Sequence, residues 1–427
     1  MEWIEETKKL YLDILREELV PALGCTEPIA VAYASAVTRR TLGCFPERIL
    51  AECSGNIIKN VKGVIVPMSG QMRGVEAAAV LGCVGGDPER RLEVLEGVTQ
   101  EHILRTRELL DERLCEVRLL DTRAKLHIRI TMTAGDRSAV TEVVHTHTGI
   151  VYQEKDGETL LSVPYDEEEA EAGLTDRSCL TVERIIQFAD TVPLAQIRPI
   201  LEPQIACNSA ISDEGIRGKY GAAIGATILD NYGNDIKVRA RARAAAGSDA
   251  RMGGCVFPVV INSGSGNQGM TVSIPVIEYW KELELPEEAL YRALCVSNLV
   301  AIHQKSQIGR LSAFCGAVSA AAGAGAAIAY LHGAGVEDIG ATIVNTLANV
   351  AGIVCDGAKP SCAAKIASCV DAAIMGYMQT CRSRNFSPGE GIVGEDVEQT
   401  ISDVSRIARE GMGVTDEEIL KIMTASR

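Results

Sequence analysis

Hydrophobic residues follow different periods in the two halves of this chain, and this change constrains the fold more than any other feature. Between residues 115 and 162, short runs of Val, Ile, Leu and Thr alternate with polar residues, and the segments DTRA, AGDRS and KDGE separate them. This pattern predicts an antiparallel meander. From about residue 179 onward, apolar residues recur at helical spacing. The sequence therefore predicts an α+β fold, with an antiparallel sheet first and mostly helices later.

Two domains follow from this change of period. We expect a small α+β domain over residues 1–165 and a mostly helical domain over residues 170–427. The acidic stretch PYDEEEAEAGLTDRS at 164–178 shows neither period and marks the boundary between them. In the first domain, helices are predicted at 3–20, 28–42 and 73–83.

Charge and composition exclude several classes of partner. The chain has 42 basic and 57 acidic residues, a net charge of −15 and no Lys/Arg-rich run, so nucleic acid and anionic membranes are not expected as partners. The N-terminus lacks a signal-peptide pattern, and the apolar stretch 311–330 is mainly Ala, Gly and Ser, so we expect a cytoplasmic protein. With only 4% aromatic residues, the core must rely on small and aliphatic side chains in closely packed helices, which are compatible with a homodimer.

The 14 cysteines cannot form a disulfide framework in a reducing cytosol, and most are expected to be small buried hydrophobes. Three in the second half stand out. Cys315 lies among small residues in SAFCGAVSAAAG, and Cys355 and Cys362 flank the loop in VCDGAKPSCAA. Pro360 places Cys362 near a helix N-terminus, which favours the thiolate. Cys369 is either a fourth ligand on the same helical face or a core residue.

Three thiolates can hold an iron–sulfur cluster, although the spacing matches neither a zinc C-x-x-C pair nor the ferredoxin pattern. A cubane cluster held by three thiolates keeps one iron without a protein ligand. That iron can act as a Lewis acid in the elimination of hydroxide or sulfide from a β-carbon, while a base removes the α-proton. On spacing alone, the cluster and a purely structural role for these cysteines both remain open.

A further cysteine introduces an apolar helix in the stretch ALGCTEPIAVAYASA at 22–36. Pro28 suits the first helical turn, and Thr26 or Glu27 suits the cap, so Cys25 lies directly before the helix N-terminus, where a thiolate is stabilised. Such a thiolate can serve as a base, a nucleophile or a metal ligand. The alternative is a packed cysteine at a helix entry.

The segment GSGNQG at 264–269 matches G-x-G-x-x-G, but a dinucleotide site requires this loop to open a helix within a βαβ unit. Pro275 and the β-branched residues before it argue against such a helix, and no parallel strand follows. The loop still offers backbone amides and polar side chains suited to a small carboxylate or a phosphate, unless it is only a tight turn. These side chains belong to Ser263, Ser265, Asn267 and Gln268.

Four segments resemble the L-cysteine desulfidase family, whose members are relatives of the iron–sulfur L-serine dehydratases: LGCTEPIAVAYASA, SGNIIKNVKGV, INSGSGNQGMTVSIPVIEYW and CDGAKPSCAAKIA. The resemblance extends over nearly the whole chain. It implies conversion of L-cysteine to pyruvate, ammonia and sulfide with a 4Fe-4S cluster and without pyridoxal phosphate. It places the cluster ligands at Cys315, Cys355 and Cys362, and the catalytic cysteine, as base or displaceable fourth ligand, at Cys25.

The same resemblance extends to Asn56, Lys59 and Asn60 in GNIIKN, which we expect to hold the substrate carboxylate or to order the site. The alternative for Lys59 is a solvent-facing lysine. The chain departs from the family at VPMSGQMRG, residues 66–74, where relatives tend to have a turn richer in glycine and threonine. No lysine has a setting that marks a pyridoxal phosphate aldimine. The histidines form no metal triad, and His147, on a predicted strand with His145, is expected to be structural or at the surface.

Three other functions remain open on the sequence. The same machinery acting on L-serine would release water, because thiolate and hydroxyl differ only in their affinity for one iron. A non-enzymatic iron–sulfur redox sensor would need a partner-binding surface, and the polar glycine loop and the lack of a basic face argue against it. A small-ligand binding protein would use the loop alone and leave every cysteine structural.

Overall fold

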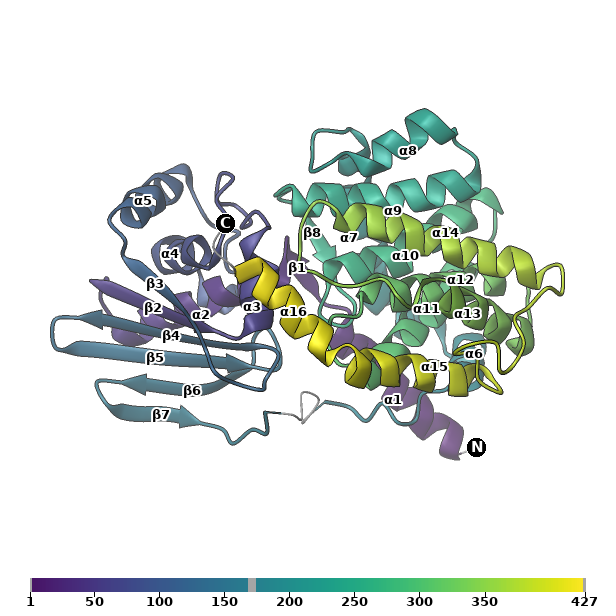
Figure 1. Ribbon diagram of the computed structural model, residues 1–427, viewed down its shortest axis with the longest axis horizontal. Coiled ribbons are helices and arrows are strands. Elements are labelled where there is room, and N and C mark those ends of the chain that lie inside the picture. Colours follow the sequence, from purple (N-terminus) through teal and green to yellow (C-terminus); the bar gives the residue numbers. More distant parts are fainter. Residues whose placement is uncertain (1, 168–173, 425–427) are drawn as a thin grey trace.

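The computed structural model describes residues 2–167 and 174–424 and shows two lobes (Figure 1). A sheet with its covering helices forms one lobe, and a bundle of helices forms the other. The predicted α+β class is confirmed, with the sheet in the N-terminal region and the helices in the C-terminal region. Residues 168–173, part of the predicted boundary, lie outside the described residues.

Six strands form the sheet in the order β3-β2-β4-β5-β6-β7. Neighbouring strands are antiparallel except β2 and β3, which run parallel. The predicted meander is confirmed from β4 onward, and Gly135, Asp156 and Gly157 have the positive φ that tight hairpin turns require. The strands are β2 (Arg48–Cys53), β3 (Cys115–Leu119), β4 (His127–Ala134), β5 (Arg137–Val144), β6 (Ile150–Lys155) and β7 (Glu158–Ser162).

Small residues allow the helices of this lobe to pack at short range. A Cβ on Gly82 of α4 would lie 2.2 Å from the carbonyl oxygen of Ala32 on α2, so only glycine permits this contact. The core of the lobe consists largely of Ala, Val, Ile and Leu, as the low aromatic content predicts. Its helices are α2 (Thr26–Leu42), α3 (Gly55–Lys62), α4 (Val75–Gly85) and α5 (Gln100–Asp111).

The helical lobe surrounds α12, the Ala- and Gly-rich segment, whose residues are almost all buried. Gly323 of α12 touches the backbone of α11, where a Cβ would lie 2.4 Å from the Ser297 carbonyl oxygen. None of the described helices is both long and apolar enough to cross a membrane. The helices are α6 (Val182–Thr191), α7 (Leu194–Ile216), α8 (Ile224–Tyr232), α9 (Ile236–Met252), α10 (Gly266–Glu282), α11 (Glu287–Ile308), α12 (Gly316–Leu331), α13 (Val336–Val350), α14 (Cys362–Thr380) and α15 (Val397–Arg406).

Segments from both ends of the chain connect the lobes. The first helix, α1 (Glu2–Glu18), packs its buried Tyr11, Ile14 and Leu15 into the core of the helical lobe rather than under the sheet. The last helix, α16 (Gly413–Thr424), returns to α3 and lies across both lobes in Figure 1. Between them, β1 (Pro21–Leu23) pairs antiparallel with β8 (Pro258–Val260).

The glycine-rich segment opens a helix, so the prediction drawn from Pro275 was wrong. Helix α10 runs from Gly266 through Pro275 to Glu282 and is buried over most of its length. Burial against neighbouring helices outweighs the one backbone hydrogen bond that a proline removes. The conclusion against a dinucleotide site rests instead on topology, because the strand before the loop, β8, has only three residues and is antiparallel to β1.

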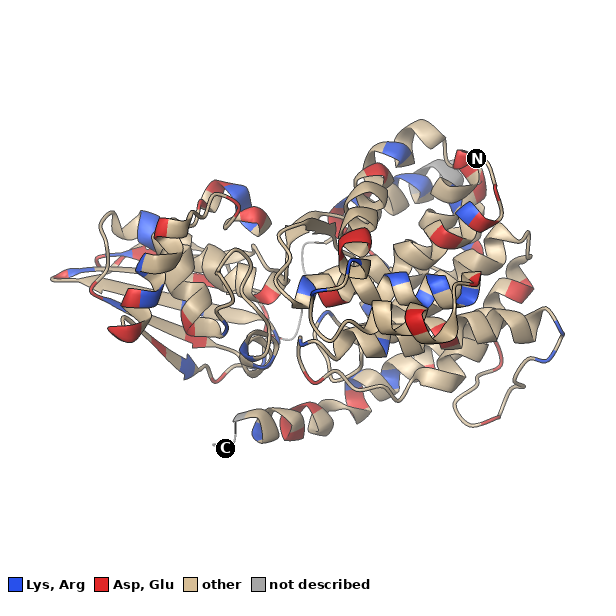
Figure 2. Ribbon diagram, turned by 90° about the horizontal axis from the view of Figure 1, so that it is seen from above, with Lys and Arg blue, Asp and Glu red and all other residues tan. Residues whose placement is uncertain are grey.

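Lys/Arg and Asp/Glu residues are interspersed over both lobes in the view of Figure 2.

Candidate functional site

Cys25 lies where the two lobes meet, directly before α2. The preceding Gly24 has a φ of 58° and packs against Pro67, a conformation that suits glycine. Cys25 is the N-cap residue of α2 in an extended conformation, and its side chain does not cap the helix. The predicted place before a helix N-terminus is confirmed, and the residue is only 1% exposed.

The Cys25 thiol is held as a neutral group by its surroundings. Its Sγ donates a hydrogen bond to Oε2 of Glu27 over 3.2 Å. Burial raises the pKa of the thiol, and the Glu27 carboxylate raises it further. The predicted stabilisation of a thiolate is therefore wrong for the polypeptide itself, since burying a charge costs more than the helix N-terminus offsets. The thiol packs in a small cluster with residues of both lobes: Val64, Met252, Ala358 and Cys362.

Glu27 receives hydrogen bonds from three side chains. Besides the Cys25 thiol, Asn60 of α3 donates from Nδ2 to Oε1 over 2.9 Å, and the Thr26 hydroxyl lies 3.1 Å from Oε2. The same hydroxyl lies 3.0 Å from the carbonyl oxygen of Gly264, so its single proton serves either acceptor. Glu27 thereby ties the start of α2 to α3 and to the glycine loop of the other lobe.

His147 and Arg251 lie close enough to Glu27 to influence its charge. Burial raises the pKa of Glu27, but the protonated form of His147, the Arg251 guanidinium and the Cys25 hydrogen bond outweigh it, so the pKa is held below its usual range. Burial lowers the pKa of His147 to about 4, which makes the ring neutral at neutral pH. Its Nε2 has no hydrogen-bond partner among the described residues. His147 lies in the turn after β5, not on a strand, and is buried.

Cys315 and Cys355 are brought together by an antiparallel bridge between Phe314 and Val354. Each cysteine donates its backbone N–H to a carbonyl oxygen across this bridge, over 3.0 Å for Cys315 and 2.5 Å for Cys355. Cys315 is also the N-cap residue of α12. Two cysteines 40 positions apart in the sequence therefore share one short strand-like contact.

Cys362 is the first residue of α14, as its prediction near a helix N-terminus requires. Burial raises the pKa of the Cys362 thiol, and the nearby Lys359 and Lys365 oppose this. Burial and the neighbouring Cys355 and Cys362 thiols raise the pKa of Cys315 to about 12. The three thiols thus lie within electrostatic reach of one another, and the two lysines would favour their ionised forms.

These three thiols fit the donor set of an iron–sulfur cluster. Thiolates are the usual protein ligands of such clusters. No three Cys, His, Asp or Glu side chains in the described part of the chain could share a single metal ion. A cluster of several irons is wider than one ion, so its ligands stand further apart. Cys369, the alternative fourth ligand, is fully buried in the core of the helical lobe.

Two of the polar residues predicted in the glycine loop have structural partners. Ser265 is the N-cap residue of α10, and its hydroxyl accepts the backbone N–H of Gln268 over 3.5 Å. Ser263, at a φ of 48°, donates its hydroxyl proton to Oδ1 of Asn262 over 2.9 Å. Both side chains therefore shape the loop.

The other two loop residues keep unused acceptors. Oδ1 of Asn267 and Oε1 of Gln268 are buried and have no hydrogen-bond partner among the described residues. Gln268 lies against Gly316, where a Cβ would be 2.5 Å from the carboxamide carbon. The glycine loop therefore contacts the start of α2 through Gly264. Through Gln268 it also contacts Gly316, the residue that follows the predicted cluster ligand Cys315.

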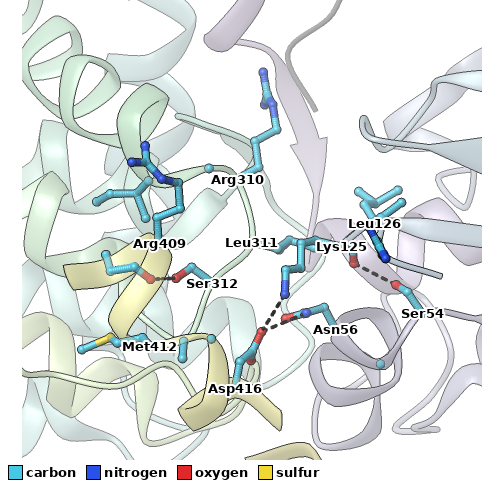
Figure 3. A pocket seen from close by; sticks show the side chains of 18 of the residues that line it. Ser54, Asn56, Lys125, Leu126, Arg310, Leu311, Ser312, Arg409, Met412 and Asp416 are labelled. Carbon is cyan, nitrogen blue, oxygen red and sulfur yellow. Dashed lines mark hydrogen bonds and ion pairs between the residues drawn. The ribbon is translucent and has the colours of Figure 1, made fainter. Parts of the chain in front are cut away.

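The α3 residues predicted to hold a carboxylate do hold one, but it belongs to the chain. Nζ of Lys59 lies 2.5 Å from Oδ1 of Asp416 on α16, and both side chains are buried. Nδ2 of Asn56 donates to Oδ2 over 3.1 Å, and Nζ of Lys125 lies 3.8 Å from it (Figure 3). Lys59 is therefore not a solvent-facing lysine. The backbone of Lys59 touches Gly357, in the loop between Cys355 and Cys362.

A cavity of about 910 Å³ opens between the lobes beside these residues. Asn56 and Lys59 line one side, and the segment from Arg310 to Ala313 lines another (Figure 3). No cysteine lines it among the described residues. Ala313 lines the cavity, however, and its carbonyl oxygen accepts the backbone N–H of Cys355. This wall of the cavity therefore adjoins the backbone bridge between Phe314 and Val354.

Sequence reasoning missed three residues that the structure places at this site. The sequence predicts Glu27 only as a cap, whereas the structure places its carboxylate beside the thiol of the N-cap residue Cys25. His147 and Asp416 reach the site from a turn of the sheet lobe and from the last helix, and no local pattern indicates either. Their places follow from tertiary structure alone.

An α+β sheet lobe joined to a helical lobe, with cysteines from both lobes grouped in one small apolar cluster at the junction, defines a class of two-lobed proteins with a thiol-based site. The model of one family, described as "Serine dehydratase alpha chain", matches residues 89–421. This chain belongs to that family.

Relatives extend the similarity to the segment that contains Cys25. A "UPF0597 protein" of Lachnoclostridium phytofermentans is 55% identical over 97% of this chain and 99% of its own length. Proteins of the same name are 50% identical in Treponema denticola, over 97% of each chain, and 50% identical in Desulfitobacterium hafniense, over 99% of this chain and 98% of the relative.

Proposed function

We propose that this protein is a cluster-dependent carbon–sulfur lyase that converts L-cysteine to pyruvate, ammonia and hydrogen sulfide. The observation that carries the proposal is the small cluster at the junction of the lobes in which Cys25 packs with Val64 and Met252 and against which Cys362 packs. A buried cysteine at a helix entry is ordinary packing when considered alone. A second cysteine from the other lobe, itself grouped with Cys315 and Cys355, gives the first one a chemical context.

Cys315, Cys355 and Cys362 would hold a 4Fe-4S cluster. When bound, such a cluster supplies a Lewis-acidic iron that accepts the sulfur of the substrate as it leaves. Lys359 and Lys365, both bound to Asp356, place positive charge beside the thiols and favour their ionised forms. This chemistry needs no pyridoxal phosphate.

The elimination requires a base that removes the α-proton of L-cysteine, and we assign this role to Cys25. Loss of the α-proton and of sulfide gives 2-aminoacrylate, which tautomerises to an imine and reacts with water to give pyruvate and ammonia. To act as a base, Cys25 must first lose its own proton. The Glu27 carboxylate, at 3.2 Å, is within hydrogen-bond distance of that proton.

Substrate contacts are best assigned to groups that have no partner within the protein. Asn267 and Gln268 keep buried acceptor oxygens that suit the α-ammonium group of an amino acid. Asn60 is engaged with Glu27, and Asn56 and Lys59 hold Asp416. A substrate carboxylate at Lys59 would therefore have to replace the carboxylate of Asp416.

L-Serine is the second candidate substrate, and the description of the matching family as serine dehydratase favours it. The reaction would be the same elimination with water as the leaving group. Nothing in the geometry near Cys25 separates a thiol from a hydroxyl substrate, so turnover of the two amino acids has to be compared directly.

The test is anaerobic reconstitution with iron and sulfide, followed by assays of sulfide and pyruvate release from L-cysteine and L-serine. We expect sulfide from the wild type, cluster absorbance without turnover in Cys25→Ala, and loss of absorbance in Cys355→Ala. Cys381→Ala is the matched control, because Cys381 is exposed at the end of α14, and it should behave as the wild type.

Two results would overturn the proposal. One is a wild-type protein that takes up no cluster, and the other is equal turnover in Cys25→Ala and Cys381→Ala. Release of pyruvate from L-serine without sulfide from L-cysteine would reassign the reaction to the second candidate.

A further inference from the structure

The site contains a buried acidic group whose only part in the elimination described above is to lie beside the proton of Cys25. Glu27 is 9% exposed and lies at the second position of α2. An acidic residue in the first turn of a helix is ordinarily exposed and stabilises the helix through its dipole. Burying a carboxylate is costly unless donors surround it, so its position requires a reason beyond the helix.

The donors around Glu27 fix its carboxylate in place. Oε1 accepts from Asn60 over 2.9 Å, and Oε2 accepts from the Cys25 thiol over 3.2 Å and lies 3.1 Å from the Thr26 hydroxyl. Asn60 belongs to α3, and the Thr26 hydroxyl also reaches Gly264 of the helical lobe. Oε1 is thus anchored by a different element, α3, whereas Oε2 is held by the first residues of α2 itself.

The Cys25 thiol, in contrast, donates its single proton to Glu27. A thiol rotates about its Cα–Cβ and Cβ–Sγ bonds, and the hydrogen bond fixes the direction of the S–H bond. The lone pairs of the sulfur are then available to the rest of its cluster, against which Ala358 and Cys362 pack. We propose that Glu27 is the positioning residue of this site, and that it directs the Cys25 sulfur toward the segment 358–362.

This inference rests on the proposed function for its role in turnover, but the hydrogen bond can be tested without turnover. An S–H stretching band moves to lower frequency as the hydrogen bond strengthens, and a carboxylate is a stronger acceptor than an amide. The infrared difference between the wild type and Cys25→Ala, measured on the full chain, isolates the Cys25 band. We expect that band at lower frequency than the band of an unbonded thiol.

The variants are Glu27→Gln, which keeps shape but removes charge, and Glu27→Asp, which keeps charge but withdraws it from the thiol. Glu183→Gln is the matched control, because Glu183 occupies the same second position of α6 and is exposed. We expect the Cys25 band to move to higher frequency in Glu27→Gln and Glu27→Asp and to stay in place in Glu183→Gln. In reconstituted protein, kcat should fall roughly tenfold to a hundredfold in Glu27→Gln, with a smaller change in KM.

A Cys25 band at the frequency of an unbonded thiol in the wild type overturns the inference, even if Glu27→Gln fails to fold. An unchanged band in a folded Glu27→Gln also overturns it, as does an unchanged kcat. If the band shifts as expected but the protein releases neither sulfide nor pyruvate, the Glu27–Cys25 hydrogen bond is supported and the proposed reaction is rejected. The role of Glu27 in turnover is then rejected with it.

Discussion

Individual side chains at the junction of the lobes have charge states that their burial decides. Cys25 and His147 are both neutral because their charged forms would lose hydration, whereas Glu27 stays ionised because donors replace the water. The sequence shows that Cys25 lies at the N-terminus of α2, and this position predicts a thiolate. The structure reverses that prediction, because the sequence does not show how deeply the helix start is buried.

The neutral state of His147 predicts a specific dependence of stability on pH. Its pKa is about 4 in the folded protein against an ordinary value of 6.5, so the unfolded chain binds the proton more readily. The stabilisation from the neutral ring is complete above pH 6.5 and is lost as the pH falls toward 4, by up to about 3 kcal/mol.

Urea unfolding between pH 7.5 and pH 4.5 measures this effect. The free energy of unfolding of the wild type should fall relative to that of His147→Gln as the pH falls. His145→Gln, in the same turn, is the control for the loss of an imidazole ring. Parallel stability curves for the wild type and His147→Gln would refute the assignment of a buried neutral imidazole.

At the scale of elements, periodicity predicted those whose local pattern is uniform. The meander from β4 to β7, helix α2 and the mostly helical character of the second half were foreseen because apolar residues recur there at a regular spacing. Helices α7 and α9 were not, since α7 contains Pro199 and Pro203, and α9 alternates Arg and Ala like a strand. Strand β2 was missed as well, because it is short and its partners β3 and β4 follow it by more than 60 residues.

The candidate site shows the same division. Cys315 could be selected for its small neighbours, and Cys362 and Cys25 could be selected because a nearby proline marks a helix start. Their meeting could not be predicted from local pattern, since it depends on packing between α3 and the Cys355–Cys362 loop through Gly357. The assignment of the four cysteines to one site came from family resemblance, not from spacing.

Close packing of α11 and α12 leads to a prediction about two glycines. Gly323→Ala should destabilise the protein by about 1–3 kcal/mol, because the new Cβ would lie 2.4 Å from the Ser297 carbonyl oxygen. Gly340→Ala in α13 meets only Val397 at 3.4 Å and should gain about 0.5–1 kcal/mol from the lower flexibility of alanine. Chemical denaturation of the two variants gives both values, and equal effects would contradict the packing argument.

At the scale of the whole molecule, α16 is an element that links the lobes. Its Asp416 supplies a buried partner for Lys59 of α3, and its Leu420 is in contact with Gly55 of α3. Each lobe has its own core, so the lobes would be expected to unfold separately without such links.

Removal of residues 413–427 should therefore split unfolding into two transitions. The full chain should show one transition in calorimetry, and the truncated chain should show a separate, lower transition for the sheet lobe. Deletion of 425–427 alone keeps α16 and is the control. Asp416→Asn in the full chain should lower the midpoint temperature of the single transition without splitting it, because Asn56 keeps a hydrogen-bond partner. A single unchanged transition in the truncated chain would show that α16 does not couple the lobes.

The long separation in sequence between parts that meet in the fold also sets an order of events during synthesis. Helix α1 leaves the ribosome well before its core partners on α7 and α11, which lie roughly 200 to 300 residues later, so its apolar face stays exposed until they emerge. Cys362, which packs against the Cys25 cluster, and Asp416, which anchors α3, are both translated more than 330 residues after Cys25. The site therefore forms only once these residues have emerged, and any inorganic group must be delivered to a chain in which both lobes have been translated.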